Sequence, residues 1–133
     1  MKRNYAWSLM LAVMLAACGG GSTKLTELQR VKSGMLDIVV LSPNDALKHG
    51  KDMLVIEFRS ADGKLVDVGE VKGGASMSMS GTPMLGSVDV RRGDQAGQYI
   101  ADTQLDMTGT WRLTLEWKGP AGSGSASFSG NVS

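Results

Sequence analysis

The segment from residue 111 to residue 118 alternates strictly between apolar and polar side chains. Its apolar members are Trp111, Leu113, Leu115 and Trp117, and a charged or hydroxyl-bearing residue follows each of them. Because successive side chains of a β-strand point to opposite faces, this segment is predicted to be a strand with one face in a core and the other in water. Such a strand must bury its apolar face against a second layer of structure.

The same period of two recurs along most of the chain, and turn signals separate the segments that show it. Apolar residues alternate within 36–40, 54–59 and 99–105, and shorter apolar runs lie at 65–68, 88–90 and 126–132. The sequence Ala-Asp-Gly-Lys at 61–64 is a strong hairpin signal, since aspartate and glycine accept the positive φ of tight turns. Seven or eight short strands at this spacing predict an all-β fold, an immunoglobulin-like antiparallel β-sandwich, over residues 34–133.

Tyr99 enters a late strand directly after a turn at Gly97. This arrangement resembles the tyrosine corner of immunoglobulin-type sandwiches, in which the tyrosine hydroxyl bonds back to upstream backbone. We therefore expect the hydroxyl of Tyr99 to bind a main-chain group.

The N-terminus has the features of a secretory signal: a basic start at Lys2 and Arg3, then an apolar run too short to span a membrane. The run ends in Leu-Ala-Ala-Cys, which resembles the lipobox of bacterial lipoproteins. That resemblance implies removal of residues 1–17 and attachment of lipid to Cys18, with residues 18–33 as a tether that carries a short helix or a stalk. The protein is then expected in the cell envelope, anchored by lipid on the periplasmic side. The outer membrane is favoured because no aspartate follows Cys18.

The charge balance and the residue inventory argue against two broad classes of function. The formal net charge of +1 falls to about −1 without Lys2 and Arg3, and no basic stripe is visible, so nucleic acid is not expected as a partner. His49 is the single histidine, and it lies in a predicted turn with no nucleophilic serine or cysteine arranged around it. The protein is therefore predicted not to be an enzyme.

A methionine-rich run at residues 75–84 is the candidate for chemistry. In a strand, Met77 and Met79 would share one face, and the Gly-Thr-Pro sequence at 81–83 would turn the chain so that Met84 folds back towards them. Thioethers select Cu(I) over harder divalent ions, so this cluster is a candidate copper site. The alternative is that these methionines fill a core or groove, which their flexibility suits.

Two further residues are candidate ligands. Met107 closes the predicted strand that begins at Tyr99 and could approach the methionine run, although it could equally pack with Trp111 at the end of the core. His49 is the only imidazole, so any mixed methionine–histidine site must use it, and a solvated loop histidine is the alternative.

The order of these motifs resembles a known family. The motifs lie at residues 47–50, 54–58, 62–66, 77–84, 97–99 and 107–113. They look like those of a YtkA-like domain, which is related to FixH-type proteins. The resemblance implies an immunoglobulin-like sandwich on the outer side of the bacterial cytoplasmic membrane, with copper handling, cytochrome-oxidase maturation or metal efflux as the associated roles.

Two functions are therefore expected from the sequence. The first is a lipid-anchored envelope protein that binds Cu(I) through Met77, Met79, Met84 and Met107, with His49 as an outside candidate. Such a protein would pass copper to or from an oxidase-maturation or efflux partner, because weak and open coordination favours transfer over storage. The second is a non-catalytic module that docks another envelope protein through a methionine-lined rim.

Overall fold

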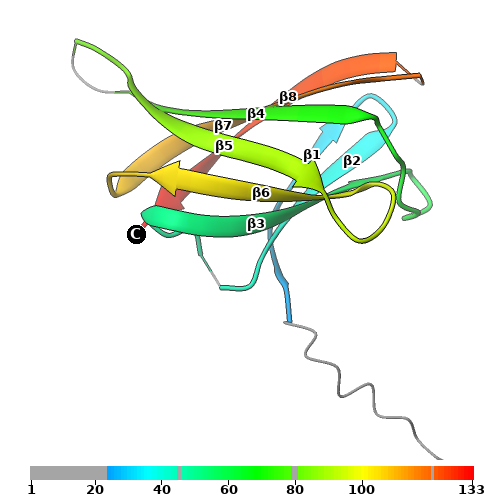
Figure 1. The fold of residues 1–133 in the computed structure, drawn as a ribbon, viewed down its shortest axis with the longest axis horizontal. Helices are drawn as coiled ribbons and strands as arrows, with labels where there is room; N and C mark the ends of the chain where they lie inside the picture. Colours follow the sequence, from blue (N-terminus) through cyan, green and yellow to red (C-terminus); the bar gives the residue numbers. More distant parts are fainter. Residues whose placement is uncertain (1–23, 45, 79–80, 121) are drawn as a thin grey trace, which may run out of the picture.

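The computed structural model describes residues 24–44, 46–78, 81–120 and 122–133, and it shows eight strands (Figure 1). Cys18 and Met79 lie outside the described residues. The strands are β1 (Thr26–Ser33), β2 (Leu36–Ser42), β3 (Gly50–Arg59), β4 (Glu70–Met77), β5 (Met84–Arg92), β6 (Gln98–Leu105), β7 (Gly109–Gly119) and β8 (Gly122–Val132). No helix able to cross a membrane occurs within these ranges. The predicted all-β class is confirmed.

The strands form one curled antiparallel sheet in the order β1-β2-β3-β6-β5-β4-β7-β8. The curl produces the two layers of a sandwich, and β5 belongs to both of them. Its first part, up to Gly86, pairs with β4, and its second part, from Ser87, pairs with β6. A β-carbon on Gly86 would lie 2.7 Å from Leu105 Cδ2, so the change of layer occurs where a glycine lets the backbone approach the core.

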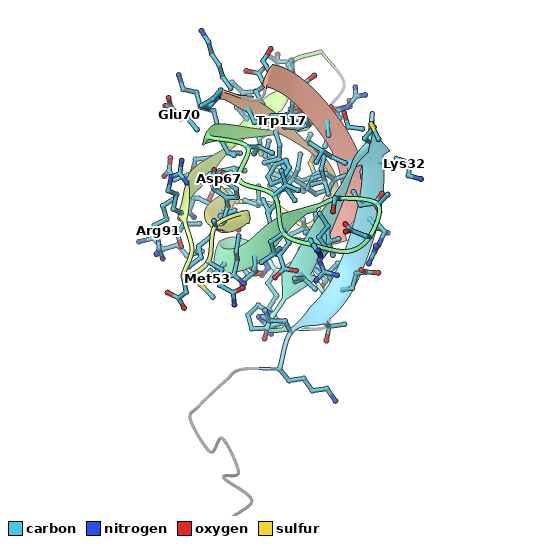
Figure 2. The ribbon with its side chains drawn as sticks, turned by 90° about the vertical axis from the view of Figure 1, so that its right-hand side faces the viewer. Lys32, Met53, Asp67, Glu70, Arg91 and Trp117 are labelled. Carbon is cyan, nitrogen blue, oxygen red and sulfur yellow. The ribbon has the colours of Figure 1, made fainter. Side chains whose placement is uncertain are left out.

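The core fills the space between the layers, as the alternating pattern of β7 predicted. Trp111 is fully buried, Leu113 and Leu115 are buried with it, and Trp117 is 7 % exposed. The polar residues that alternate with them along β7 face outward. Phe58 packs edge-on against both Tyr99 and Trp117, with ring centroids 5.5 and 5.1 Å apart. In Figure 2 the side chain of Arg91 points away from the domain on one side and that of Lys32 on the other.

The segment expected to be a helix or stalk is strand β1, so the sandwich begins at Thr26 instead of residue 34. The apolar residues Leu28 and Val31 are three apart, which resembles helical spacing, and both pack against the core. A register shift between Glu27 and Gln29 explains this spacing, because a β-bulge adds one residue and changes the face that follows. The prediction for this segment was wrong because a bulge and a helical turn give similar local patterns.

The hydroxyl of Tyr99 binds upstream backbone, as expected. It donates to the carbonyl oxygen of Gly69 at 2.7 Å and lies 3.2 Å from Oδ1 of Asp67. The acceptor is 30 residues upstream, in the connection between β3 and β4, so the bond ties β6 to that connection.

Candidate functional site

One end of the sandwich is formed by the end of β4, the start of β5 and the turn between β6 and β7 (Figure 1). Met77 is the last residue of β4 and Met84 is the first residue of β5, and the two are direct cross-strand partners. Directly opposed side chains in an antiparallel pair have β-carbons about 4.5–5.5 Å apart. The structure therefore brings these two predicted ligands together.

Met77 lies at the inner side of this end. It is 8 % exposed and belongs to the hydrophobic core, and its thioether reaches the start of β7. A β-carbon on Gly109 would lie 2.5 Å from Cε and 3.8 Å from Sδ of Met77. The sulfur of Met77 is thus next to the turn that carries Met107.

Met107 was expected to close the strand that begins at Tyr99, but β6 ends at Leu105, and Met107 lies two residues further on, in the turn before β7. Its side chain is 39 % exposed. The buried Trp111 donates its Nε1 proton to the carbonyl oxygen of Met107 at 2.9 Å. Trp111 therefore packs in the core, as one reading expected, and also fixes the backbone of the turn.

His49 lies near the same end, because the next residue, Gly50, pairs with the last residue of β6. Its backbone N–H donates to the carbonyl oxygen of Ser133 at 3.0 Å, and its ring Nδ1 lies 3.2 Å from the same oxygen. The ring is exposed. These contacts run to the backbone of Ser133, so they hold His49 beside the end of β8.

The arrangement gives this end a soft, sulfur-based donor set. Met77 and Met84 are adjacent, Met107 is on the neighbouring turn, and Met79 falls outside the described residues. In the described part of the chain, no three or more His, Cys, Asp and Glu side chains are grouped so that they could hold a metal ion. A metal bound at this end would depend on thioethers, which suit Cu(I).

Sequence reasoning missed one feature of this end. Leu85 is a large apolar side chain that is 74 % exposed, and it directly follows Met84. The signal was available in the sequence, because a residue next to an inward-facing position on a strand must face outward.

A group of interacting polar side chains lies at the end of the sandwich opposite the methionines, and the pKa values of Asp67 and Tyr99 are shifted there. The Arg92 guanidinium, 2.8 Å from the carboxylate, holds the pKa of Asp67 below its usual range. Burial raises the pKa of Tyr99, and the neighbouring Asp67 charge adds to that effect. These groups form a structural cluster with the Gly69 backbone, and they do not involve the methionines.

Comparison with known proteins identifies a family and similar folds. The family described as YtkA-like matches residues 30–116. No curated protein matches the sequence. Among solved structures, a DUF4426 family protein from Pseudomonas aeruginosa PAO1 superposes with a TM-score of 0.55 at 18 % identity, covering 77 % of this chain and 94 % of that one. A copper-bound variant of FetP from uropathogenic Escherichia coli strain F11 superposes with a TM-score of 0.48 at 10 % identity. The match covers 81 % of this chain and 97 % of that one. The Lin-41 filamin domain superposes with a TM-score of 0.44 at 14 % identity. The match covers 66 % of this chain and 81 % of that one. These likenesses concern the fold alone.

Proposed function

The chain belongs to the YtkA-like family, and on that premise we propose that it is a non-catalytic copper-handling protein of the bacterial cell envelope. Copper is its cargo, bound as Cu(I) at the methionine end of the sandwich. Lipid on Cys18 would anchor the domain on the periplasmic side of a membrane. A copper-handling or efflux protein would exchange the ion with it.

The observation that supports this proposal best is the direct pairing of Met77 with Met84. Two thioethers on opposed positions of a hairpin end can share one small, soft ion, whereas methionines scattered through a core cannot. Met107, on the adjacent turn, is a further candidate ligand, and so is Met79, which lies between Met77 and Met84 in the sequence. His49 is the outside candidate, since its ring contacts the Ser133 carbonyl oxygen through Nδ1 and leaves the lone pair of Nε2 to bind a metal.

The burial of these residues suits transfer of the ion. Met77 is nearly buried, Met84 is half-buried and Met107 is 39 % exposed. An ion held between them would be covered by protein on the core side and open on the solvent side. A second protein could therefore offer its own ligand to the open side without unfolding of the domain.

Anaerobic titration of the full chain with Cu(I), in a neutral detergent and against a competing Cu(I) chelator, tests the proposal. All variants carry Cys18→Ser, because a free thiol would itself bind Cu(I). Met84→Leu and Met107→Leu keep the apolar volume, so the fold should persist. Each is expected to weaken Cu(I) binding at least about tenfold. A change in a residue that only hydrogen-bonds to a metal ligand already has an effect of that size.

The matched control is Met35→Leu. Met35 is 85 % exposed in the turn between β1 and β2, at the opposite end of the sandwich, and its loss should leave Cu(I) binding unchanged. A further variant carries four changes together: Met77→Leu, Met79→Leu, Met84→Leu and Met107→Leu. If this variant binds Cu(I) as tightly as the parent chain, the proposed copper site is wrong.

A second function is supported by a separate observation. Leu85 and Met107 are two of the three large apolar side chains that are exposed among the described residues, and both lie at the methionine end. Where exposed apolar side chains form a contiguous patch, they mark a docking surface. If the chain binds no Cu(I) and a partner protein is lost on Leu85→Ser, the docking module is the correct function.

A further inference from the structure

A shallow hollow lies on the outer face of β4, β7 and β8, immediately beside the methionine end. Its volume is about 380 Å³, and it is lined by Ser76, Met77, Ser78, Thr110, Arg112 and Ser129. Besides Met77, the lining residues are three serines, one threonine and Arg112. The hollow therefore offers hydroxyl groups and a single positive charge.

Arg112 differs from the other arginines in the part of the chain that the structure describes. Arg30, Arg59, Arg91 and Arg92 each form an ion pair with an aspartate or glutamate. Arg112 is exposed, and its side chain makes no ion pair or hydrogen bond with a described residue. Its cross-strand partners are Ser76 on β4 and Ser129 on β8, so no carboxylate lies opposite it on either side.

The hydroxyl groups around Arg112 complete a donor set for an anion. A guanidinium offers a planar fork of N–H donors that matches the two oxygens of a carboxylate, and serine hydroxyls can donate to the same oxygens. Thr110 already donates to Oδ1 of Asn131 at 2.8 Å, which orients its side chain beside the hollow. The chemistry of the lining thus favours a carboxylate.

The shape of the hollow decides the source of that carboxylate. Small molecules bind in concave sites that cover most of their surface, and an open hollow on a sheet face cannot do this. A side chain of a protein can bind there, because the surrounding surface supplies the remaining contacts. Leu85 lies in the same cross-strand row, next to Ser76, and is 74 % exposed.

We propose that this hollow binds an acidic side chain of a partner protein, with Arg112 as the anchor and Leu85 as the adjacent apolar contact. The geometry points to a partner segment that carries an aspartate or glutamate next to an apolar residue. The proposal does not require copper, although it places the partner beside the methionines. It goes beyond the copper function because it names the chemistry of the docking partner.

Copper-free ¹⁵N NMR titrations of the full chain in neutral detergent test this proposal. The probe is the peptide acetyl-Leu-Asp-Glu-Leu-amide, and its neutral counterpart has asparagine and glutamine in the two acidic positions. The acidic peptide should shift the amide signals of Thr110, Arg112 and Ser129 to saturation, and the neutral peptide should not. Arg112→Gln should weaken binding at least about tenfold, and Arg112→Lys should weaken it less, because lysine keeps the charge but loses the fork.

The matched control is Lys72→Gln. Lys72 is exposed on the same face of β4 as Ser76, and it does not line the hollow, so the change removes one positive charge nearby and leaves the hollow intact. Unchanged binding in this variant supports the specific role of Arg112. Equal loss in Lys72→Gln and Arg112→Gln would show general charge attraction and overturn the proposal, as would an absence of saturable binding. Saturation by free citrate at lower concentrations than the peptide would assign the hollow to small anions instead. Failure of the copper titration would leave all of these results unaffected.

Discussion

The thioether end of Met77 rests on the backbone of Gly109, so that any β-carbon at Gly109 would lie 2.5 Å from Met77 Cε. Gly109 also has a φ of +132°, which L side chains rarely adopt. The end of β4 and the start of β7 are therefore in contact through one flexible side chain and one glycine. The position of the Met77 sulfur depends on that contact.

Gly109→Ala is expected to displace Met77. The new methyl group would compete with Met77 Cε for the same space, and the flexible methionine side chain can move aside at little cost. The ε-methyl signal of Met77 in a ¹³C-methyl NMR spectrum should therefore shift, and Cu(I) affinity should fall.

Gly122→Ala is the matched control for this prediction. Gly122 has a similar φ of +127°, but a β-carbon there would meet nothing within 4 Å. Both variants should lose about 1 kcal/mol or slightly more of unfolding free energy through the backbone alone. An unmoved Met77 methyl signal in Gly109→Ala would contradict the contact.

Trp111→Phe is expected to loosen the turn that carries Met107. The substitution removes the 2.9 Å bond from Trp111 Nε1 to the Met107 carbonyl and leaves that oxygen without its donor. Together with the lost core volume, we expect a destabilisation of about 1–3 kcal/mol in urea unfolding. Trp117→Phe is the control, because Trp117 packs on Phe58 towards the other end of the core. Hydrogen exchange at residues 106–109 should accelerate in Trp111→Phe and stay unchanged in Trp117→Phe.

Much of the fold could be predicted because most strands have two different faces. The alternation in β7 gave both the strand and its buried side, including Trp111 and Trp117. The strand β1 was missed because its bulge at Glu27–Gln29 breaks the period of two. The division of β5 between two layers could not be predicted either, because the pairing of strands that are distant in sequence leaves no local pattern at Gly86.

The candidate site was only partly accessible to sequence reasoning. The pairing of Met77 with Met84 follows from a short turn between two strand segments, and the Gly-Thr-Pro sequence signalled such a turn. The approach of Met77 to Gly109 depends on strands that pair far apart in sequence. Arg112 was interpreted as an ordinary polar residue of an amphipathic strand, because its lack of a carboxylate partner becomes visible only once Ser76 and Ser129 are placed beside it.

Tyr99→Phe is expected to destabilise the domain by about 1–2 kcal/mol, because the Gly69 carbonyl loses the hydroxyl that donates to it at 2.7 Å. The urea midpoint should fall while the slope m stays constant, since the compactness of the fold is unchanged. An unchanged midpoint would mean that water replaces the hydroxyl without loss.

Asp67 is expected to contribute to stability at neutral pH and to lose that contribution in acid. Its pKa is lowered in the folded state, chiefly by the bond from Arg92 and also by the Gly69 N–H. The contribution is therefore present above the unfolded-state pKa of about 3.9 and is lost as the pH falls through the lower folded-state pKa. Urea unfolding of the parent chain and Asp67→Asn should differ most near pH 6 and converge towards pH 3. Parallel curves across this range would contradict the assignment.

The adjacent glycines of β4, Gly73 and Gly74, are expected to respond oppositely to alanine. A β-carbon on Gly73 would lie 2.6 Å from Cγ1 of the buried Val88 on β5, whereas one on Gly74 would meet nothing within 4 Å. Gly73→Ala should therefore cost about 1–3 kcal/mol, because the β-branched Val88 has little freedom to move and the sheet must open where β5 changes layer. Gly74→Ala should be neutral or stabilising by up to about 1 kcal/mol, because alanine loses less backbone entropy than glycine on folding. Thermal unfolding of the two variants side by side measures the difference, and equal effects would show that β4 and β5 are not closely packed at this point.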